Sequence, residues 1–346
     1  MTAEAESLQQ ARRLTRALMN PDPKIYWADF LLNISLGWSV FALILSEPRL
    51  WLQVPLFVVA VLTFYRAAIF IHELAHLYRN RVPGFRLVWN LLCGIPFLVP
   101  SFSYDGVHNE HHKKSAYGTG DDGEYLPFAR MAPWRLLAYA LLSWLLPVLF
   151  VVRFALLTPL SWGIPQLRPW LWRSASSLII DPDYQRPASA IRHDAKTWRL
   201  QETCASIWAI MVLTLVVTGV WPMSVLILWY AVMASVFFLN SLRTLVAHAY
   251  RNPADQAMSV IEQFQDSINV PGHRFWTALW APVGLRYHAT HHLFPSMPYH
   301  NLDKAHWLLV NELDDNRWYL AASRQSLWSA LAQIWREAAN DQQATR

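Results

Sequence analysis

Long apolar runs alternate with polar segments along this chain of 346 residues. Four of the runs are long enough to cross the roughly 30 Å hydrocarbon core of a bilayer as α-helices. These four runs lie at 26–45, 50–71, 204–220 and 222–245. Within each pair, the two runs are separated by a turn of only a few residues. The pattern predicts an all-α integral membrane protein with about four transmembrane helices in two hairpins.

Two further apolar runs are interrupted. Residues 87–102 contain a glycine and two prolines and are too short to cross, so we expect a re-entrant or interfacial helix there. Residues 134–160 contain Pro147 and Arg153, and we expect this run to lie in the interface or to double back at Pro147. The alternative is that it crosses the membrane and another run does not.

The polar segments comprise a leader at 1–25 and two stretches at 72–203 and 246–346. We expect the two stretches to form a helical cap on a single membrane domain, 26–346. The leader is basic, and Arg79 and Arg81 follow the second apolar run. The excess of Lys and Arg on cytoplasmic segments therefore predicts that both termini and the cap are cytoplasmic.

The composition supports a membrane protein and excludes some functions. Charged residues make up 15% of the chain and hydrophobic residues 54%, whereas soluble domains carry about 25% charged residues. The net charge is +5, but no basic cluster interleaves with stacking aromatics, so we expect no nucleic-acid partner. The two cysteines, Cys93 and Cys204, form no CxxC pair and provide no internal Cys-ligated redox centre.

Most of the histidines fall into three short boxes with helical spacing. The boxes read HxxxH at 72–76 and HxxHH at both 108–112 and 288–292. Positions i, i+3 and i+4 share one face of a helix. Imidazole is a ligand for iron, zinc, copper or nickel, and eight imidazoles are too many for one ion. We therefore predict two ions bound by these residues: His72, His76, His108, His111, His112, His288, His291 and His292.

Two other classes of protein use histidines in membranes. The first box reads HELAH, which also matches the zinc-protease signature with Glu73 as general base. That interpretation leaves the two HxxHH boxes unexplained. A metal transporter would place its ligands along a path through the spans, whereas these boxes lie at or beyond the ends of spans. Both alternatives therefore leave part of the pattern unexplained.

The three boxes on a four-span chain resemble the membrane fatty acid desaturase superfamily, over residues 26–310. The run from Arg286 to Pro295 is similar to bacterial members, so we expect the bacterial inner membrane. The resemblance implies a non-haem diiron centre that uses O₂ to attack an unactivated C–H bond. It also implies a ninth ligand, His248, although Thr244 stands where acyl-CoA desaturases have an asparagine.

Metal-bound imidazoles usually hydrogen-bond a second group through their free ring nitrogen. The candidates for that role are Glu73, Glu110, Thr244, Asn240 and Asp303.

The superfamily's chemistry leaves the reaction open. We expect desaturation of a fatty acyl chain, carried by a free acid, a thioester or a lipid. The alternatives are decarboxylation to a terminal alkene and hydroxylation. Because the chain lacks a haem motif and a cysteine cluster, the electrons must come from an external donor such as ferredoxin or rubredoxin. The basic residues Arg79, Arg81, Lys113 and Lys114 would suit an acidic carrier.

Overall fold

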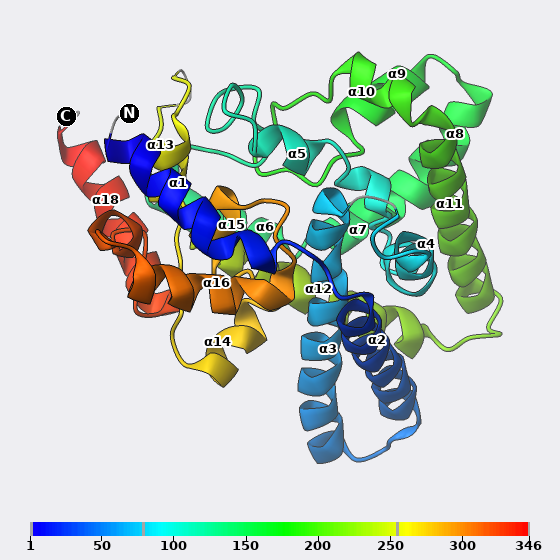
Figure 1. Cartoon of the computed structure of the whole chain (residues 1–346). Coiled ribbons are helices and arrows are strands. Elements are labelled where there is room, and N and C mark those ends of the chain that lie inside the picture. The colour runs from blue at the N-terminus through cyan, green and yellow to red at the C-terminus, as the bar shows by residue number, and fades with distance from the viewer. Residues whose placement is uncertain (1–2, 78–79, 254–255, 345–346) are drawn as a thin grey trace.

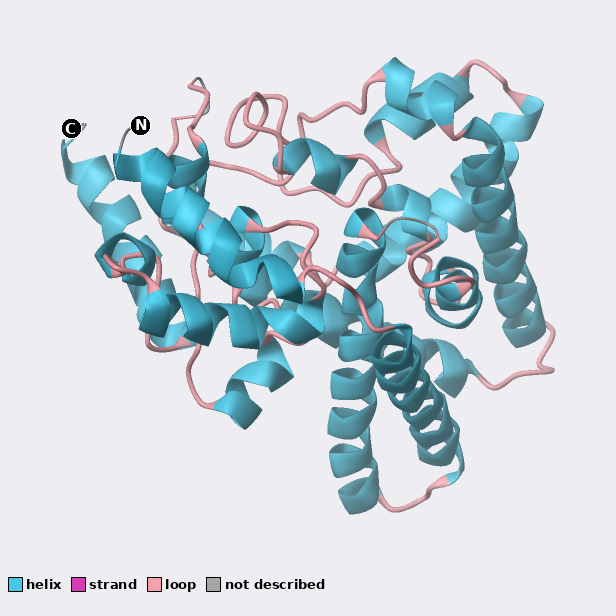
Figure 2. Ribbon diagram, viewed as in Figure 1, coloured by secondary structure: helices cyan, strands magenta, loops and turns pink. Residues whose placement is uncertain are grey.

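The computed structural model describes residues 3–77, 80–253 and 256–344, and within these ranges it contains helices and isolated bridges but no strand (Figure 2). Arg79 lies outside the described residues. The long helices are α2 (Pro23–Ser46), α3 (Leu50–His76), α11 (Ala195–Val217), α12 (Met223–Leu245) and α18 (Leu327–Ala344). The shorter helices are α1 (Ala3–Thr15), α4 (Phe85–Trp89), α5 (Val107–His111), α6 (Trp134–Leu142), α7 (Leu146–Val151), α8 (Thr158–Gly163), α9 (Leu167–Ser174), α10 (Ala188–His193), α13 (Val260–Asp266), α14 (Arg274–Trp280), α15 (His288–Leu293), α16 (Tyr299–Glu312) and α17 (Arg317–Leu320).

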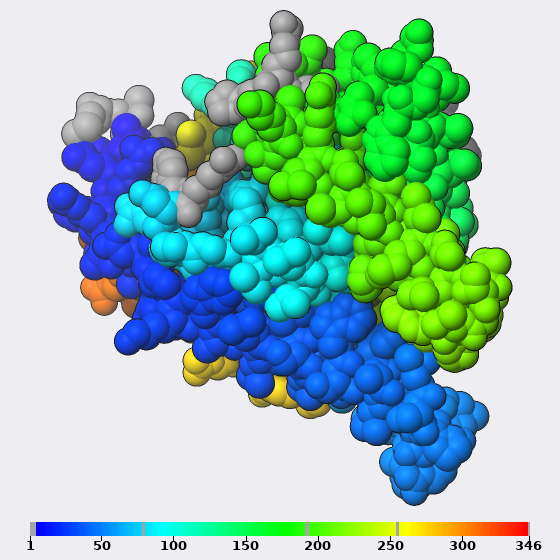
Figure 3. Space-filling view, turned by 90° about the vertical axis from the view of Figure 1, so that its right-hand side faces the viewer, coloured from blue at the N-terminus to red at the C-terminus, as the bar shows by residue number. Residues whose placement is uncertain are grey.

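Helices α2 and α3 form the first hairpin and project from the rest of the molecule (Figures 1 and 3). Asp22 caps α2 by accepting a hydrogen bond from the backbone N–H of Lys24, and Pro23 occupies the first turn, where its missing N–H is harmless. Large apolar side chains such as Leu32, Trp51 and Val58 are exposed on this hairpin. Such a surface is stable in lipid and not in water.

Five helical segments are long and apolar enough to cross a membrane, one more than the sequence predicts. Four of them match the predicted runs, and the fifth is Leu146–Gly163. The chain turns at residues 143–145, before Pro147 rather than at it. Pro147 then lies in the first turn of α7, a position that proline favours because no intrahelical N–H is lost there. The expectation of a reversal at Pro147 itself is therefore wrong.

The fifth segment carries a buried cation. The Arg153 guanidinium lies 2.6 Å from Glu202 Oε1 on α11, and it also donates to the hydroxyls of Thr158 and Ser176. Arg168 contacts the other Glu202 oxygen at 2.9 Å. A buried charge is stable only when its hydrogen-bonding groups are satisfied, so this network joins the fifth segment to α11.

The interrupted run at 87–102 is helical only from Phe85 to Gly94 and ends in a π-helical turn. Ten helical residues span about 15 Å, which is half of a bilayer core. The Asn90 side chain donates to Ser101 Oγ and accepts from the Ser101 backbone N–H. In Figure 3 this segment, drawn in cyan, lies between the hairpin and α11.

The leader and the C-terminal part pack into one helical layer at the end of α3 that carries the first box (Figure 1). Helix α1 lies against α16, Gln10 donates to the carbonyl of Glu312, and Asn301 donates to the carbonyl of Leu18. Ala11 is fully buried in this contact. The leader is thus part of the layer that holds the third box.

Candidate metal centre

The three boxes meet at the junction of four helical segments. The first box ends α3, the second lies on and just after α5, and the third begins α15. His248 lies three residues beyond the end of α12. The structure brings together all nine histidines that the sequence nominates as ligands, in two groups.

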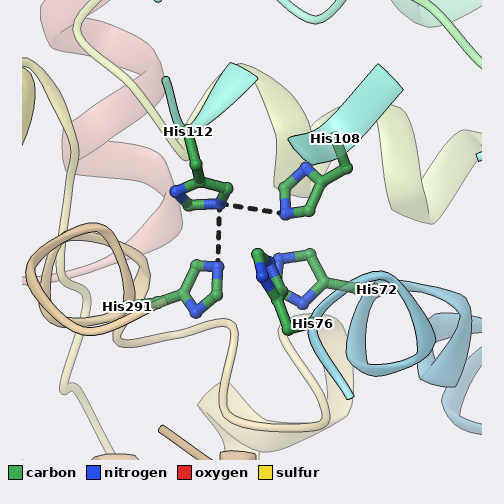
Figure 4. A group of neighbouring side chains, drawn as sticks. All are labelled: His72, His76, His108, His112 and His291. Atoms are coloured by element: carbon green, nitrogen blue, oxygen red, sulfur yellow. Dashed lines mark hydrogen bonds between the residues drawn. The ribbon is translucent and has the colours of Figure 1, made fainter. Parts of the chain in front are cut away.

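The first group contains five histidines whose ring nitrogens point at one another (Figure 4). One ligand atom from each lies within 4.8 Å of the others: His72, His76, His108, His112 and His291. His112 Nε2 is 3.1 Å from His108 Nε2 and 3.0 Å from His291 Nε2. We call this group the five-histidine cluster.

The second group contains four buried histidines within the same distance of one another: His111, His248, His288 and His292. His248 Nε2 lies 3.2 Å from His111 Nε2 and 2.9 Å from His288 Nε2. His288 and His292 bring their Nε2 atoms to 3.2 Å. We call this group the four-histidine cluster.

Each HxxHH box contributes two histidines to one cluster and one histidine to the other. In the second box the i, i+4 pair His108 and His112 serves the five-histidine cluster, while His111 serves the other. In the third box the pair His288 and His292 serves the four-histidine cluster, while His291 crosses to the first. This reciprocal arrangement fixes α5 and α15 against each other and ties the two clusters together.

Carboxylates from the loop after the second box orient two of the rings. Asp122 Oδ2 lies 2.8 Å from His111 Nδ1, and Glu124 contacts His108 Nδ1. Asp122 also accepts from the backbone N–H groups of Gly118 and Glu124, so the loop itself holds the carboxylate in place. Each carboxylate accepts the Nδ1 proton and leaves Nε2 free as a ligand.

Neighbouring hydroxyl groups orient the ring of His248. Its Nδ1 lies 2.8 Å from the Tyr117 hydroxyl, which donates to Asp266 at 3.0 Å. Tyr125 donates to the same Asp266 oxygen at 2.7 Å. Ser267 Oγ lies 3.2 Å from His248 Nδ1 and donates its own proton to the carbonyl of Gln263. Both hydroxyls near His248 therefore accept the Nδ1 proton.

These contacts show that the nitrogens fit metal ions. His111 and His248 both hold their proton on Nδ1, so their Nε2 atoms face each other as bare lone pairs at 3.2 Å. Two lone pairs repel unless a cation lies between them. Nitrogens at right angles on an ion, with bonds of about 2.1 Å, are about 3.0 Å apart. The spacing of 2.9–3.2 Å agrees with that geometry.

Burial favours neutral rings. It is the largest cause that lowers the pKa of His108, His112, His248, His288, His291 and His292 well below the usual value of 6.5. Burial also acts to lower the pKa of His111, but the charge and hydrogen bond of Asp122 outweigh it and raise that pKa. Neutral imidazole is the form that binds metal, and Asp122 stabilises positive charge on His111 from a bound cation.

The residues that the sequence nominates to orient the ligands lie elsewhere. Glu110 pairs with Lys113 at the surface, and Asp303 binds Arg286 and Tyr287. Asn240 accepts from Arg243, and Thr244 offers its carbonyl to Tyr250.

Glu73 approaches His72 Nδ1 only to 3.8 Å and instead accepts from the Tyr26 hydroxyl and the Tyr299 backbone N–H. These five nominations are therefore corrected: the partners of the ring nitrogens are Asp122, Glu124, Tyr104, Tyr117 and Ser267. Asp122 and Glu124 lie in a dense polar loop at 118–124. A loop has no periodic pattern from which their contacts with the histidines could be predicted.

The sequence model of the fatty acid desaturase family matches residues 49–324, which include all nine histidines. The chain belongs to the fatty acid desaturase family. The ceramide hydroxylase of Caulobacter vibrioides (strain NA1000 / CB15N) is 42% identical to it over 328 residues, which cover 95% of this chain and 93% of the relative. Membership in the family makes the chain an oxidoreductase of lipid metabolism that works in a membrane environment, with several apolar helices to hold it there.

Proposed function

We propose that this protein is a diiron, O₂-dependent hydroxylase of a ceramide-like lipid. The observation that carries the proposal is the pair of histidine clusters, with Nε2 atoms converging at 2.9–3.2 Å, in a chain similar to a ceramide hydroxylase over nearly its whole length. The sequence motifs alone favour desaturation, and the similarity to this ceramide hydroxylase moves the proposal to hydroxylation.

The chain's own residues prepare the site for that reaction. Burial keeps the imidazoles neutral, and Asp122, Glu124 and the Tyr117–Asp266 pair hold the Nδ1 protons. Iron bound there would supply activation of O₂ and removal of hydrogen from a C–H bond. One oxygen atom of O₂ enters the C–H bond as hydroxyl, and the other leaves as water with two protons and two electrons from an external donor. The hydrogen-bonded rings give the site a fixed geometry for that reaction.

Desaturation of a lipid acyl chain is the second candidate, and the family match supports it. Both outcomes begin with the same hydrogen removal, and they differ in whether oxygen enters or a second hydrogen leaves. Formation of a terminal alkene has no support from either comparison, so it falls behind both.

The geometry also supports a membrane arrangement with four crossings. His111 and His112 contact histidines that follow α12, so an even number of crossings separates the second box from His248. The candidates between them are Leu146–Gly163, α11 and α12, of which two cross. We assign these two to α11 and α12, which form a hairpin, and we place both termini and the clusters in the cytoplasm. An external ferredoxin or rubredoxin would then deliver electrons from that side.

Purified protein in lipid nanodiscs provides the test. It is supplied with iron, N-palmitoyl sphinganine, a ferredoxin with its reductase, and oxygen-18 gas. We expect a product that gains one labelled oxygen atom, detected by mass spectrometry. Loss of two hydrogens without oxygen would establish desaturation instead, and turnover without O₂ would refute both. His108→Ala should abolish the product, whereas His273→Ala, at an exposed position on no cluster, should retain it.

A further inference from the structure

The last turn of α12 carries a cation beside the histidine clusters that has no ionic partner. Among the residues that the structure describes, no carboxylate lies within ion-pair distance of Arg243. Its Nη2 donates to Asn240 Oδ1 at 3.0 Å, and its Nε is buried without a hydrogen-bond partner in the described part of the chain. Arg243 is partly buried, and besides Asn240 its guanidinium hydrogen-bonds the Tyr65 hydroxyl, which leaves the Nε–H as the donor without a partner.

Other arginines of the protein's interior are compensated. Arg66 pairs with Asp29, Arg153 with Glu202, and Arg286 with Asp303. Burying a charge without a partner is costly, and ionisable groups at membrane depth with no structural partner mark functional positions. The fully buried Arg186 also lacks a carboxylate, but backbone carbonyls such as those of Phe102 and Ser103 accept its hydrogen bonds. Arg243 differs in keeping a buried Nε–H that a ligand oxygen could accept.

The surroundings of Arg243 place it next to both the clusters and the α3 helix. It lies five residues before His248, and Asn240, Arg243 and Thr244 share one face of α12. The Tyr65 hydroxyl, seven residues before His72 on the same face of α3, lies beside the guanidinium and donates to the carbonyl of Trp280.

We propose that Arg243 binds an oxygen atom of the lipid substrate's polar group, its amide carbonyl or a hydroxyl, and thereby positions the carbon that is oxidised within a few bonds of that group. This inference rests on the proposed function. A polar donor beside the clusters suits a substrate whose polar end enters the site. An enzyme that attacks the middle of an acyl chain needs apolar walls there instead. Arg243 is a specificity-determining residue rather than a metal ligand.

Binding can be separated from chemistry because zinc is not redox-active. Zinc-loaded protein in nanodiscs is mixed with N-palmitoyl sphinganine, and bound lipid is measured by native mass spectrometry. We expect Arg243→Gln to weaken binding by at least about 10-fold, since a hydrogen bond to a charged group is lost. Arg243→Lys retains the charge but loses the planar guanidinium, so its affinity for the lipid should lie between those of the wild type and Arg243→Gln. Binding of n-hexadecane, which has no polar group, should not change.

The control variant is Arg251→Gln, which removes a surface cation paired with Glu337 and should bind the lipid like the wild type. Melting temperature and zinc content establish that each variant is folded. Equal affinity of the wild type and Arg243→Gln for N-palmitoyl sphinganine overturns the inference. A loss confined to phosphatidylglycerol also overturns it, because Arg243 would then bind a bilayer phosphate.

The position of the new hydroxyl gives a second readout. Tandem mass spectrometry of the wild-type product should place it within a few carbons of the amide, and a hydroxyl in the middle of the acyl chain contradicts the inference. An enzyme that binds the lipid through Arg243 but yields no oxidised product refutes the proposed function instead. The two failures are thus distinguishable.

Discussion

The two histidine clusters differ in how many nitrogens they offer and in how firmly these are held. The five-histidine cluster includes His76 and His112, which are only partly buried, whereas all four members of the other cluster are buried. In the four-histidine cluster, Asp122 holds His111, and Tyr117 and Ser267 hold His248. In the five-histidine cluster, Glu124 and Tyr104 hold only His108. In the described part of the chain, the Nδ1 atoms of His72 and His291 in this cluster and of His288 and His292 in the other have no partner, so two of four rings are held in one cluster and one of five in the other.

This difference suggests different roles for the two proposed ions. Catalytic metal sites keep an open position for water or substrate, and a cluster with four nitrogens leaves more room on its ion than one with five. The four-histidine cluster would hold its ion through fewer protein bonds, and more of its rings are fixed by hydrogen bonds to other side chains. We infer that O₂ and the lipid approach from the four-histidine side, where Arg243 also lies.

The largest expected effect comes from removing a ligand of the smaller cluster. His248→Ala leaves three nitrogens there, so we expect iron content to fall from two ions to one per chain and product formation to stop. Elemental analysis of the purified variant measures the iron. His273→Ala is the matched control and should keep both ions. Two tightly held ions in His248→Ala would contradict the assignment of His248 as a ligand.

A smaller effect is expected from the carboxylate that orients His111. Asp122→Asn removes the charge that holds the Nδ1 proton, and changes of this kind lower metal affinity about 10- to 100-fold. Chelator titration should show one ion released early while the ion of the five-histidine cluster remains. Release of both ions together would contradict the separation into two clusters.

Glu124→Gln makes the reciprocal test on the five-histidine cluster. Because the Tyr104 hydroxyl lies 3.0 Å from His108 Nδ1 and can still accept its proton, we expect about a 10-fold loss of affinity or less. The ion that is weakened should be the one that Asp122→Asn leaves intact. If both variants weaken the same ion, the assignment of loop carboxylates to separate clusters is wrong.

The smallest effect is expected from a substitution that weakens the support of α15, and it should affect metal binding at both clusters equally. Thr290, between the third-box histidines, contacts the Tyr319 hydroxyl at 2.5 Å and binds Asn269 through its backbone N–H at 3.0 Å. Tyr319→Phe removes two hydrogen bonds, to Thr290 and to His306 Nδ1, and should lower the free energy of unfolding by about 2 kcal/mol. Thermal denaturation measures the loss. Since α15 supplies histidines to both clusters, selective loss of one ion in this variant would contradict the exchange of histidines between the clusters.

The sequence predicts which histidines gather but not how they divide. Spacing of i, i+3 and i+4 places His108, His111 and His112 on one helix face, and the structure brings them to one centre. Adjacent residues on a helix nevertheless point about 100° apart. His111 and His112 therefore lie in different clusters, which becomes visible only when the position of α15 is known.

The contacts of the loop at 118–124 and the course of the fifth apolar segment could not be predicted from the sequence, for a related reason. Asp122 and Glu124 act through a loop whose shape depends on contacts such as Asp122 with the Gly118 N–H, and loops carry no periodic pattern. Pro147 reads as a break in the sequence, yet it starts a helix in the structure because proline is tolerated in a first turn. Both outcomes depend on tertiary contacts rather than on local pattern.

The most direct test of the two unequal sites is the Mössbauer spectrum of the protein loaded with iron-57 and frozen as purified in nanodiscs. The two clusters differ in ligand number and in hydrogen bonding, so the iron nuclei should experience different surroundings. We predict two quadrupole doublets of equal area from two iron ions per chain. A single doublet, or one iron per chain, would contradict the account.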